Sequence, residues 1–193
     1  MEARAMLWSI VGLIVLGLAV LAYVGVVTGA VPFDIGIGRR TRPLGPQIVE
    51  IAAPRELVFD IIAMPYLGRQ PRAVAEKIEI LERGDDLVLA AHRTPVHGGR
   101  LVATTVETVR FERPERVHFR LVRGPVPHVV EQFVLEDAGD TTRLEYHGEL
   151  GTDLWFIGSW WGRLVARTWE RTVAQSLAAV RTEAERRQST TGG

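Results

Sequence analysis

The stretch PQIVEIAAPRELVFDIIAMPYLGR, residues 46–69, changes its hydrophobic spacing halfway along. Residues 48–52 alternate between two faces, and such alternation indicates a β-strand. Pro54 suits the first turn of a helix, and the apolar residues of 57–62 recur at helical spacing on one face. We expect this helix to end near Ala63, because the residue before a proline disfavours the α conformation. The stretch therefore predicts a strand that leads directly into a short helix.

Six further strand-like runs follow between residues 74 and 151. In each of them apolar residues recur at every second position: VAEKIEILE, DLVLAAHRT, RLVATTVETVRF, RVHFRLVR, HVVEQFVLE and TRLEYHGEL. Short turn sequences such as RGDD and DAGD separate these runs. Strands joined by such short turns pair with their neighbours, so the region predicts an antiparallel meander.

A long helix is expected at the carboxyl end of the chain. Apolar residues recur at intervals of three and four over residues 161–180 and form one stripe. We expect residues 155–157 to precede this helix, Ser159 to be its N-cap or a turn residue, and residues 188–193 to form a disordered tail. The order of strand, short helix, six strands and long helix predicts an α+β domain over residues 46–187, with its helices on one face of an antiparallel sheet.

Residues 5–27 at the amino end carry no charge. A helix of this length reaches roughly 35 Å at about 1.5 Å per residue, enough to cross a hydrocarbon core of about 30 Å. We therefore expect a single-pass transmembrane helix. The alternative is a signal peptide cleaved before Val31, although the apolar run is long and the preceding residues are weakly basic for one.

Arginines on the two sides of this segment indicate its orientation. Arg4 precedes it, whereas three arginines follow it in the basic, glycine-rich linker of residues 28–45 (Arg39, Arg40 and Arg42). The positive-inside rule then places the large carboxyl-terminal domain in the cytoplasm.

Two motifs within the domain resemble those of one known superfamily. The opening VEIAAPRELVFDIIAMPYLGR and the late element GDTTRLEYHGEL, followed by the long helix, resemble the START-like or SRPBCC superfamily, which includes polyketide cyclase/dehydrase-like and Bet v 1-like proteins. The resemblance covers about residues 45–187 and implies a helix-grip fold, in which the sheet curls around the terminal helix. Members bind lipids, sterols, polyketides or hormones, and the superfamily has no universal catalytic residue, so the resemblance does not decide the activity.

Signals for cofactors and for nucleic acid are missing from the sequence. The chain has no cysteine, no HExxH spacing and no glycine-rich phosphate-binding motif, so we expect neither a metal nor another cofactor. The formal net charge is zero. The arginines of residues 110–123 are interrupted by Glu112 and Glu115, so we expect a solvated strand face and no binding of nucleic acid.

The alternation within the strands predicts which side chains face the interior. With the helix stripe, the expected ligand-cavity residues are Val117, Phe119, Leu121, Glu131, Phe133, Leu144, Tyr146, Trp161, Val165 and Trp169. Glu131 is the main polar candidate, because a carboxylate in an apolar cavity either finds a partner or becomes neutral. Two alternatives without a functional role remain open. Glu131 could lie at the mouth of the cavity, paired with Arg120 or Arg123, and Tyr146 could be a wall residue with a solvent-exposed hydroxyl. No catalytic residue is assigned beyond these two weak candidates.

Four of the five tryptophans lie in DLWFIGSWWGRLVARTW, residues 153–169. We expect Trp161 and Trp169 to face inward, and Trp155, Phe156 and Trp160 to form a rim that closes the mouth or dips into the bilayer interface. Plain core filling by the whole cluster is the alternative.

Three functional hypotheses follow. The first is a membrane-anchored module that binds a lipid or another hydrophobic small molecule between the sheet and the long helix, without catalysis. The second is a polyketide cyclase/dehydrase-type enzyme with Glu131 and Tyr146 as acid/base groups. The third is a membrane-bound assembly module without a ligand. The oligomeric state does not follow from the sequence.

Overall fold

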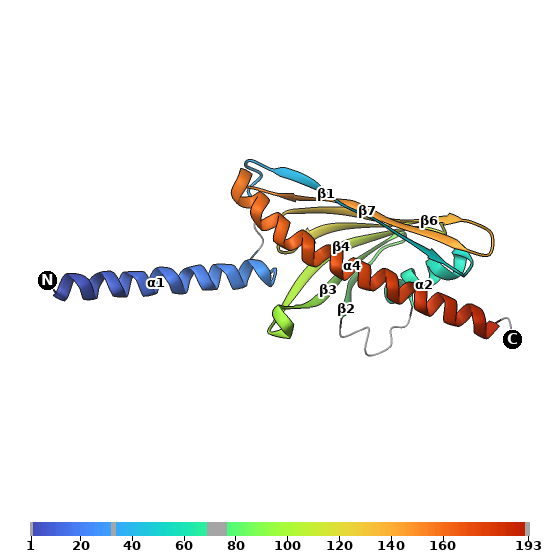
Figure 1. Ribbon diagram of the computed structural model, residues 1–193, viewed down its shortest axis with the longest axis horizontal. Helices are drawn as coiled ribbons and strands as arrows, with labels where there is room; N and C mark the ends of the chain where they lie inside the picture. Colours follow the sequence, from blue (N-terminus) through green and yellow to red (C-terminus); the bar gives the residue numbers. More distant parts are fainter. Residues whose placement is uncertain (1, 32–33, 69–76, 192–193) are drawn as a thin grey trace.

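The computed structural model describes residues 2–31, 34–68 and 77–191 of the chain (Figure 1). An apolar helix is followed by a strand, a short helix, six more strands and a long helix. The elements are α1 (Glu2–Val27), β1 (Arg40–Ile51), α2 (Arg55–Leu67), β2 (Ile78–Arg83), β3 (Leu87–Val96), the 3₁₀ turn η1 (His97–Gly99), β4 (Leu101–Glu112), β5 (Arg116–Arg123), β6 (His128–Asp137), β7 (Thr142–Thr152) and α4 (Trp155–Thr191).

The seven strands of the described residues form one antiparallel sheet in the order β1-β7-β6-β5-β4-β3-β2. Strands β2 to β7 follow one another as the predicted meander, and β1 pairs with the last strand. The helices α2 and α4 lie on the same side of the sheet, where α4 packs against β1, β7 and α2 (Figure 1). The predicted α+β helix-grip fold is therefore confirmed.

The core lies between this face of the sheet and the two helices. Phe59 of α2, Leu144 and Tyr146 of β7 and Leu177 of α4 are buried there. Burying such side chains stabilises the fold by about 1.5–3 kcal/mol each.

Several element boundaries differ from those expected. Helix α2 continues past Ala63 to Leu67 with Pro65 inside it. A proline in the last turn removes a single hydrogen bond, and the buried ring of Tyr66 packs against Phe111 and Phe119. This packing outweighs the local preference.

Strand β1 begins at Arg40, so residues 40–45 of the expected linker belong to the sheet. They pair with the end of β7, whose edge would otherwise stay open. Of the expected second strand, residues 74–76 lie outside the described residues.

Helix α4 begins at Trp155 and includes the residues expected to precede it. The hydroxyl of Ser159 donates to the Trp155 carbonyl inside the helix, so Ser159 is not the N-cap. The helix also extends to Thr191, beyond the expected start of the tail, and ion pairs of Glu183 with Arg186 and Arg187 support its last turns.

Residues Met6–Val27 of α1 form a helix that is long and apolar enough to cross a membrane, and only 6% of its apolar segment is buried inside the protein. The helix contacts the domain through its carboxyl end, where Val27 is buried and the Thr104 amide donates to the Thr28 carbonyl at 3.1 Å. The Tyr23 hydroxyl also lies 2.8 Å from His97 Nε2 in η1. The amino end of α1 projects away from the domain (Figure 1).

Candidate functional site

Glu131 lies on the inner face of β6, and its side chain is buried beneath α4. The Tyr146 hydroxyl and the Trp169 indole N–H both donate hydrogen bonds to Glu131 Oε2, each at 2.7 Å. The structure therefore pairs Glu131 with Tyr146 and Trp169 in the interior, and not with Arg120 or Arg123 as in the alternative. Among the described residues, none donates a hydrogen bond to the other carboxyl oxygen, Oε1. That oxygen is the one available to a bound molecule.

Gly148 makes room for this carboxylate. It pairs directly with Glu131 across β6 and β7. A Cβ atom at residue 148 would lie 2.7 Å from Glu131 Cβ and 2.5 Å from the Val130 carbonyl oxygen. Any larger residue at this position would displace the Glu131 backbone or side chain.

A second polar group lies on the same face of the sheet, towards α2. His92 Nδ1 is 3.2 Å from Glu107 Oε2, and the Tyr66 hydroxyl is 3.3 Å from His92 Nε2. Glu107 pairs with Leu121 on one edge of β5, and Glu131 pairs with Phe119 on the other, so a single strand separates the two glutamates.

Sequence reasoning missed this second group, although a signal was present. Glu107 alternates in step with Val109, and His92 alternates in step with Ala90, both of which are buried. The same alternation that placed Glu131 inward would have placed Glu107 and His92 inward.

The pKa values of the two glutamates move in opposite directions. Burial and the nearby charge of Glu107 raise the pKa of Glu131 from 4.5 to about 7, against the hydrogen bonds from Tyr146 and Trp169. Burial alone would also raise the pKa of Glu107, but the charge and hydrogen bond of His92, with a hydrogen bond from Thr105, lower it. Burial opposes the charge on His92, yet Glu107 raises the pKa of the imidazole overall. The interior thus holds an ionised His92–Glu107 pair beside a carboxyl group that titrates near neutral pH.

The predicted cavity residues divide by exposure. Val117, Leu144 and Tyr146 have no accessible surface, and Phe119 and Leu121 have little. Tyr146 therefore holds Glu131 and does not offer a wet hydroxyl. Phe133 on the sheet, and Trp161, Val165 and Trp169 on α4, stay half-buried and keep surface that a ligand can cover.

The tryptophan cluster is divided in the same way. Trp155, Phe156 and Trp160 are exposed, at 52%, 74% and 58% of their surface, at the start of α4. The Trp161 indole instead donates to the Pro125 carbonyl at 2.8 Å, and Trp169 reaches Glu131. Core filling by the whole cluster is therefore wrong. We call Trp155, Phe156, Ile157 and Trp160 the exposed rim.

A buried aspartate ties the segment before β1 to the start of α4. Asp153 accepts backbone hydrogen bonds from Ile35 and Gly36 and a side-chain hydrogen bond from Arg39 Nε, all at 2.8 Å. The Arg39 hydrogen bond, with the two backbone bonds, lowers the pKa of Asp153 against the effect of burial. Gly38 has a φ of +63°, and the Trp155 ring lies where its Cβ would be, so a glycine is needed here.

Solved structures with the same fold include three whose chains are covered almost completely. The Zhui aromatase/cyclase from Streptomyces sp. R1128 has 21% identity and a TM-score of 0.65, with 80% of this chain and 99% of that chain covered. A protein from Thermus thermophilus has 16% identity and a TM-score of 0.57, over 75% and 97% of the two chains. A START superfamily protein from Mycobacterium smegmatis has 18% identity and a TM-score of 0.52, over 74% and 97%. At these identities the likeness concerns the fold.

No curated protein matches the chain. Residues 47–185 match the family described as polyketide cyclase / dehydrase and lipid transport, and this range spans most of the chain and all of the inner polar residues. The seven-stranded sheet, the long helix across it and this match lead to one conclusion: the chain belongs to the polyketide cyclase/dehydrase and lipid transport family.

Proposed function

We propose that the protein is a membrane-anchored module that binds a hydrophobic small molecule or lipid between the sheet and α4. The observation that carries the proposal is the incomplete burial of apolar side chains that pack against the core from the sheet and from α4. Phe111 and Phe133 on the sheet, and Val165 and Trp169 on the helix, are half-buried although they point into the interior. Apolar surface left uncovered inside a fold gains about 25 cal/mol per Å² when a ligand covers it.

The polar groups favour a ligand that carries a hydroxyl or carbonyl oxygen. With a pKa of about 7, Glu131 is partly protonated at neutral pH and can donate or accept through Oε1. A second carboxylate, Glu107, lies on the same inner face. An anionic head would meet both acids, so a neutral head group fits better.

The proposed membrane attachment is supported by α1 and by the exposed rim. The apolar surface of Met6–Val27 is almost entirely uncovered by protein, and a bilayer would cover it. The arginine bias of the flanks favours a cytoplasmic domain. Such a tether would raise the effective concentration of the domain near ligands dissolved in the membrane.

A titration with a lipophile panel tests the binding proposal. The full chain in detergent micelles would be mixed with a fatty acid, an isoprenoid alcohol, a sterol and an aromatic polyketide-like compound, and the shift in Tm would be measured. We expect at least one class to raise the Tm of the wild type, and Phe133→Trp, which fills the interior, to lose that shift. Phe156→Trp makes the same change on the exposed rim and should keep it. The proposal is abandoned if no compound shifts the wild type, or if both variants respond alike.

Acid/base catalysis on a polyketide-like substrate is the second candidate. It is favoured by a buried carboxyl group that titrates near pH 7 and is held at 2.7 Å by Tyr146. In this reading Glu131 moves the proton, and Tyr146 and Trp169 position it. Glu131→Gln should then abolish turnover of an aromatic-polyketide precursor while leaving its binding intact, and the wild-type rate should change near pH 7. A Glu131→Gln variant that still turns over the precursor would rule this candidate out.

A further inference from the structure

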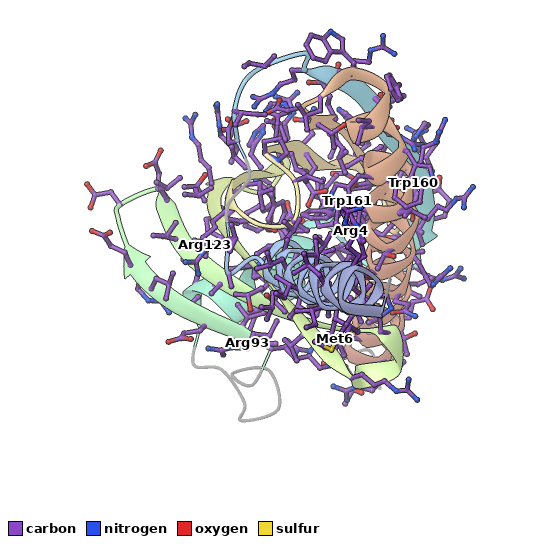
Figure 2. The ribbon with its side chains drawn as sticks, turned by 90° about the vertical axis from the view of Figure 1, so that its left-hand side faces the viewer. Arg4, Met6, Arg93, Arg123, Trp160 and Trp161 are labelled. Atoms are coloured by element: carbon purple, nitrogen blue, oxygen red, sulfur yellow. The ribbon has the colours of Figure 1, made fainter. Side chains whose placement is uncertain are left out.

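A second apolar space lies outside the interior, where α1 meets the start of α4. This hollow of about 290 Å³ is lined by Ala22, Tyr23 and Val26 of α1, by Pro125 and Pro127, and by residues of 152–161 including Trp161. Its walls thus come from the last turns of the apolar helix on one side, and from the loop after β5 and the start of α4 on the other. Figure 2 views this face along α1 and shows Trp161 between α1 and α4.

The face around the hollow is the one that a bilayer would meet. Helix α1 leaves the domain from the middle of this face and points towards the viewer in Figure 2. The exposed rim lies on the same side of the domain, at the end of α4 nearest to α1 (Figure 1). Tyr23 is four residues from the end of the apolar span, where interfacial aromatics are common, and its ring meets Trp161 edge-on at 6.3 Å. A membrane that holds α1 therefore brings the hollow to the level of the lipid head groups.

A line of half-buried apolar residues leads from the hollow to Glu131. Trp161, Val165 and Trp169 are spaced by four residues on one face of α4, and all three keep accessible surface. The helix rises about 1.5 Å per residue, so the line is about 12 Å long. It begins at a wall of the hollow and ends at the indole that donates to Glu131.

We propose that this hollow is the door through which a single-chain lipophile passes from the bilayer into the interior, and that Trp161 is its gate. The proposal rests on the proposed function, because it needs an interior that accepts a ligand. An apolar hollow of about 290 Å³ suits part of one acyl or prenyl chain, and this chain would reach it from the bilayer without crossing water.

The gate is held by one hydrogen bond and by one contact between aromatic rings. A hydrogen bond to the Pro125 carbonyl holds the indole of Trp161, and the Tyr23 ring packs on its edge. Tyr23 is itself held by His97. The gate is thus made jointly by the apolar helix and the domain, which gives α1 a role beyond attachment.

Photolabelling in vesicles tests the door. The full chain would be reconstituted into phosphatidylcholine vesicles that contain a diazirine-bearing long-chain alcohol, irradiated at intervals and digested with trypsin. Labelling of the peptide of residues 168–171, which carries Trp169, reports arrival in the interior. Ala22→Trp places a large ring in the hollow, and Ala19→Trp makes the same change on α1 at a residue that does not line it.

We expect Ala22→Trp to slow interior labelling about tenfold, which corresponds to a barrier higher by about 1.4 kcal/mol, and Ala19→Trp to leave the rate unchanged. Trp161→Phe, which lacks the hydrogen bond to Pro125, should speed it severalfold. Equal rates in all four proteins would overturn the door while leaving the proposed function standing. An absence of interior label in the wild type, even at long times, would overturn the proposed function and the door together.

Discussion

Glu107 and Glu131 lie on the same face of one sheet and are both buried, yet their surroundings differ. Glu107 lies near α2 and faces an imidazole, whereas Glu131 lies beneath α4 and faces a phenol and an indole. The first environment lowers the pKa of its carboxyl group, and the second leaves the pKa raised to about 7. Neutral donors offset burial only in part, whereas an opposite charge outweighs it. One end of the interior is therefore held as an ion pair, and the other is left with a proton to exchange.

Removing His92, the charged partner of Glu107, should lower the free energy of unfolding more than any other change. His92→Leu leaves Glu107 buried without its counter-ion, and breaking a buried pair in this way costs about 3–5 kcal/mol. Urea unfolding of the full chain in mild detergent, followed by tryptophan fluorescence at pH 7.5, measures the loss. His128→Leu removes a histidine whose partner, Glu149, is exposed, and should cost less than about 1 kcal/mol. Equal losses in the two variants would contradict the comparison.

Replacing Glu131 or Glu107 by glutamine should change the free energy of unfolding in opposite directions. In the folded state Glu131 keeps its proton up to about pH 7, whereas the unfolded chain releases it near 4.5. The stability from this group is therefore present below pH 4.5 and is lost as the pH rises through 7. From pH 4.5 to 8 the wild type should lose about 3 kcal/mol relative to Glu131→Gln, at 1.36 kcal/mol per pKa unit.

Glu107→Gln should instead destabilise the protein, because it removes the carboxylate that raises the pKa of His92. The difference from the wild type should be largest between about pH 4.5 and 6.5, where both groups of the pair are ionised, and should shrink as the pH rises through the raised pKa of His92. Unfolding free energies measured across this pH range test both statements. Parallel curves for the wild type and Glu131→Gln would show that Glu131 is not protonated in the folded state near neutral pH.

Losing one neutral donor should have a smaller effect. Tyr146→Phe removes a hydrogen bond that lowers the pKa of Glu131, so this pKa should rise above 7 and stability at pH 8 should fall by about 1–2 kcal/mol. The infrared band of the protonated carboxyl group, followed against pH, reports the shift. Tyr23→Phe removes a hydroxyl that bonds His97 and should leave the band unchanged. A band that titrates at the same pH in both variants would mean that Tyr146 does not tune Glu131.

A substitution in the exposed rim should change the free energy of unfolding least. Phe156→Ser removes a side chain that is 74% exposed, and surface changes of this kind stay within about 0.5 kcal/mol. If the rim touches lipid, the same variant should still show less quenching of tryptophan by brominated lipids than the wild type does. A large loss of unfolding free energy would instead place Phe156 in the core.

The fold could be predicted because local patterns agree with it. The alternation of apolar residues in β6 predicted that Glu131 faces inward, and the apolar stripe on α4 predicted the same for Trp161 and Trp169. The boundaries of β1 and α4 could not be predicted in this way, because distant contacts set them. Asp153 holds Arg39 across 114 residues of sequence, and Arg40 pairs with Thr152 at the end of β7. A short stretch of sequence around residue 40 or residue 155 therefore does not contain the residues whose contacts set these boundaries.

Mass spectrometry of lipophiles that co-purify with the full chain tests the central claim most directly. Wild type and Phe133→Trp would be purified side by side in detergent, extracted with solvent and compared, so that lipid carried by α1 appears equally in both. The account predicts one lipophile near stoichiometric amounts in the wild type that is missing from Phe133→Trp. Identical extracts, together with no rise in Tm across the lipophile panel, would contradict a ligand-binding interior.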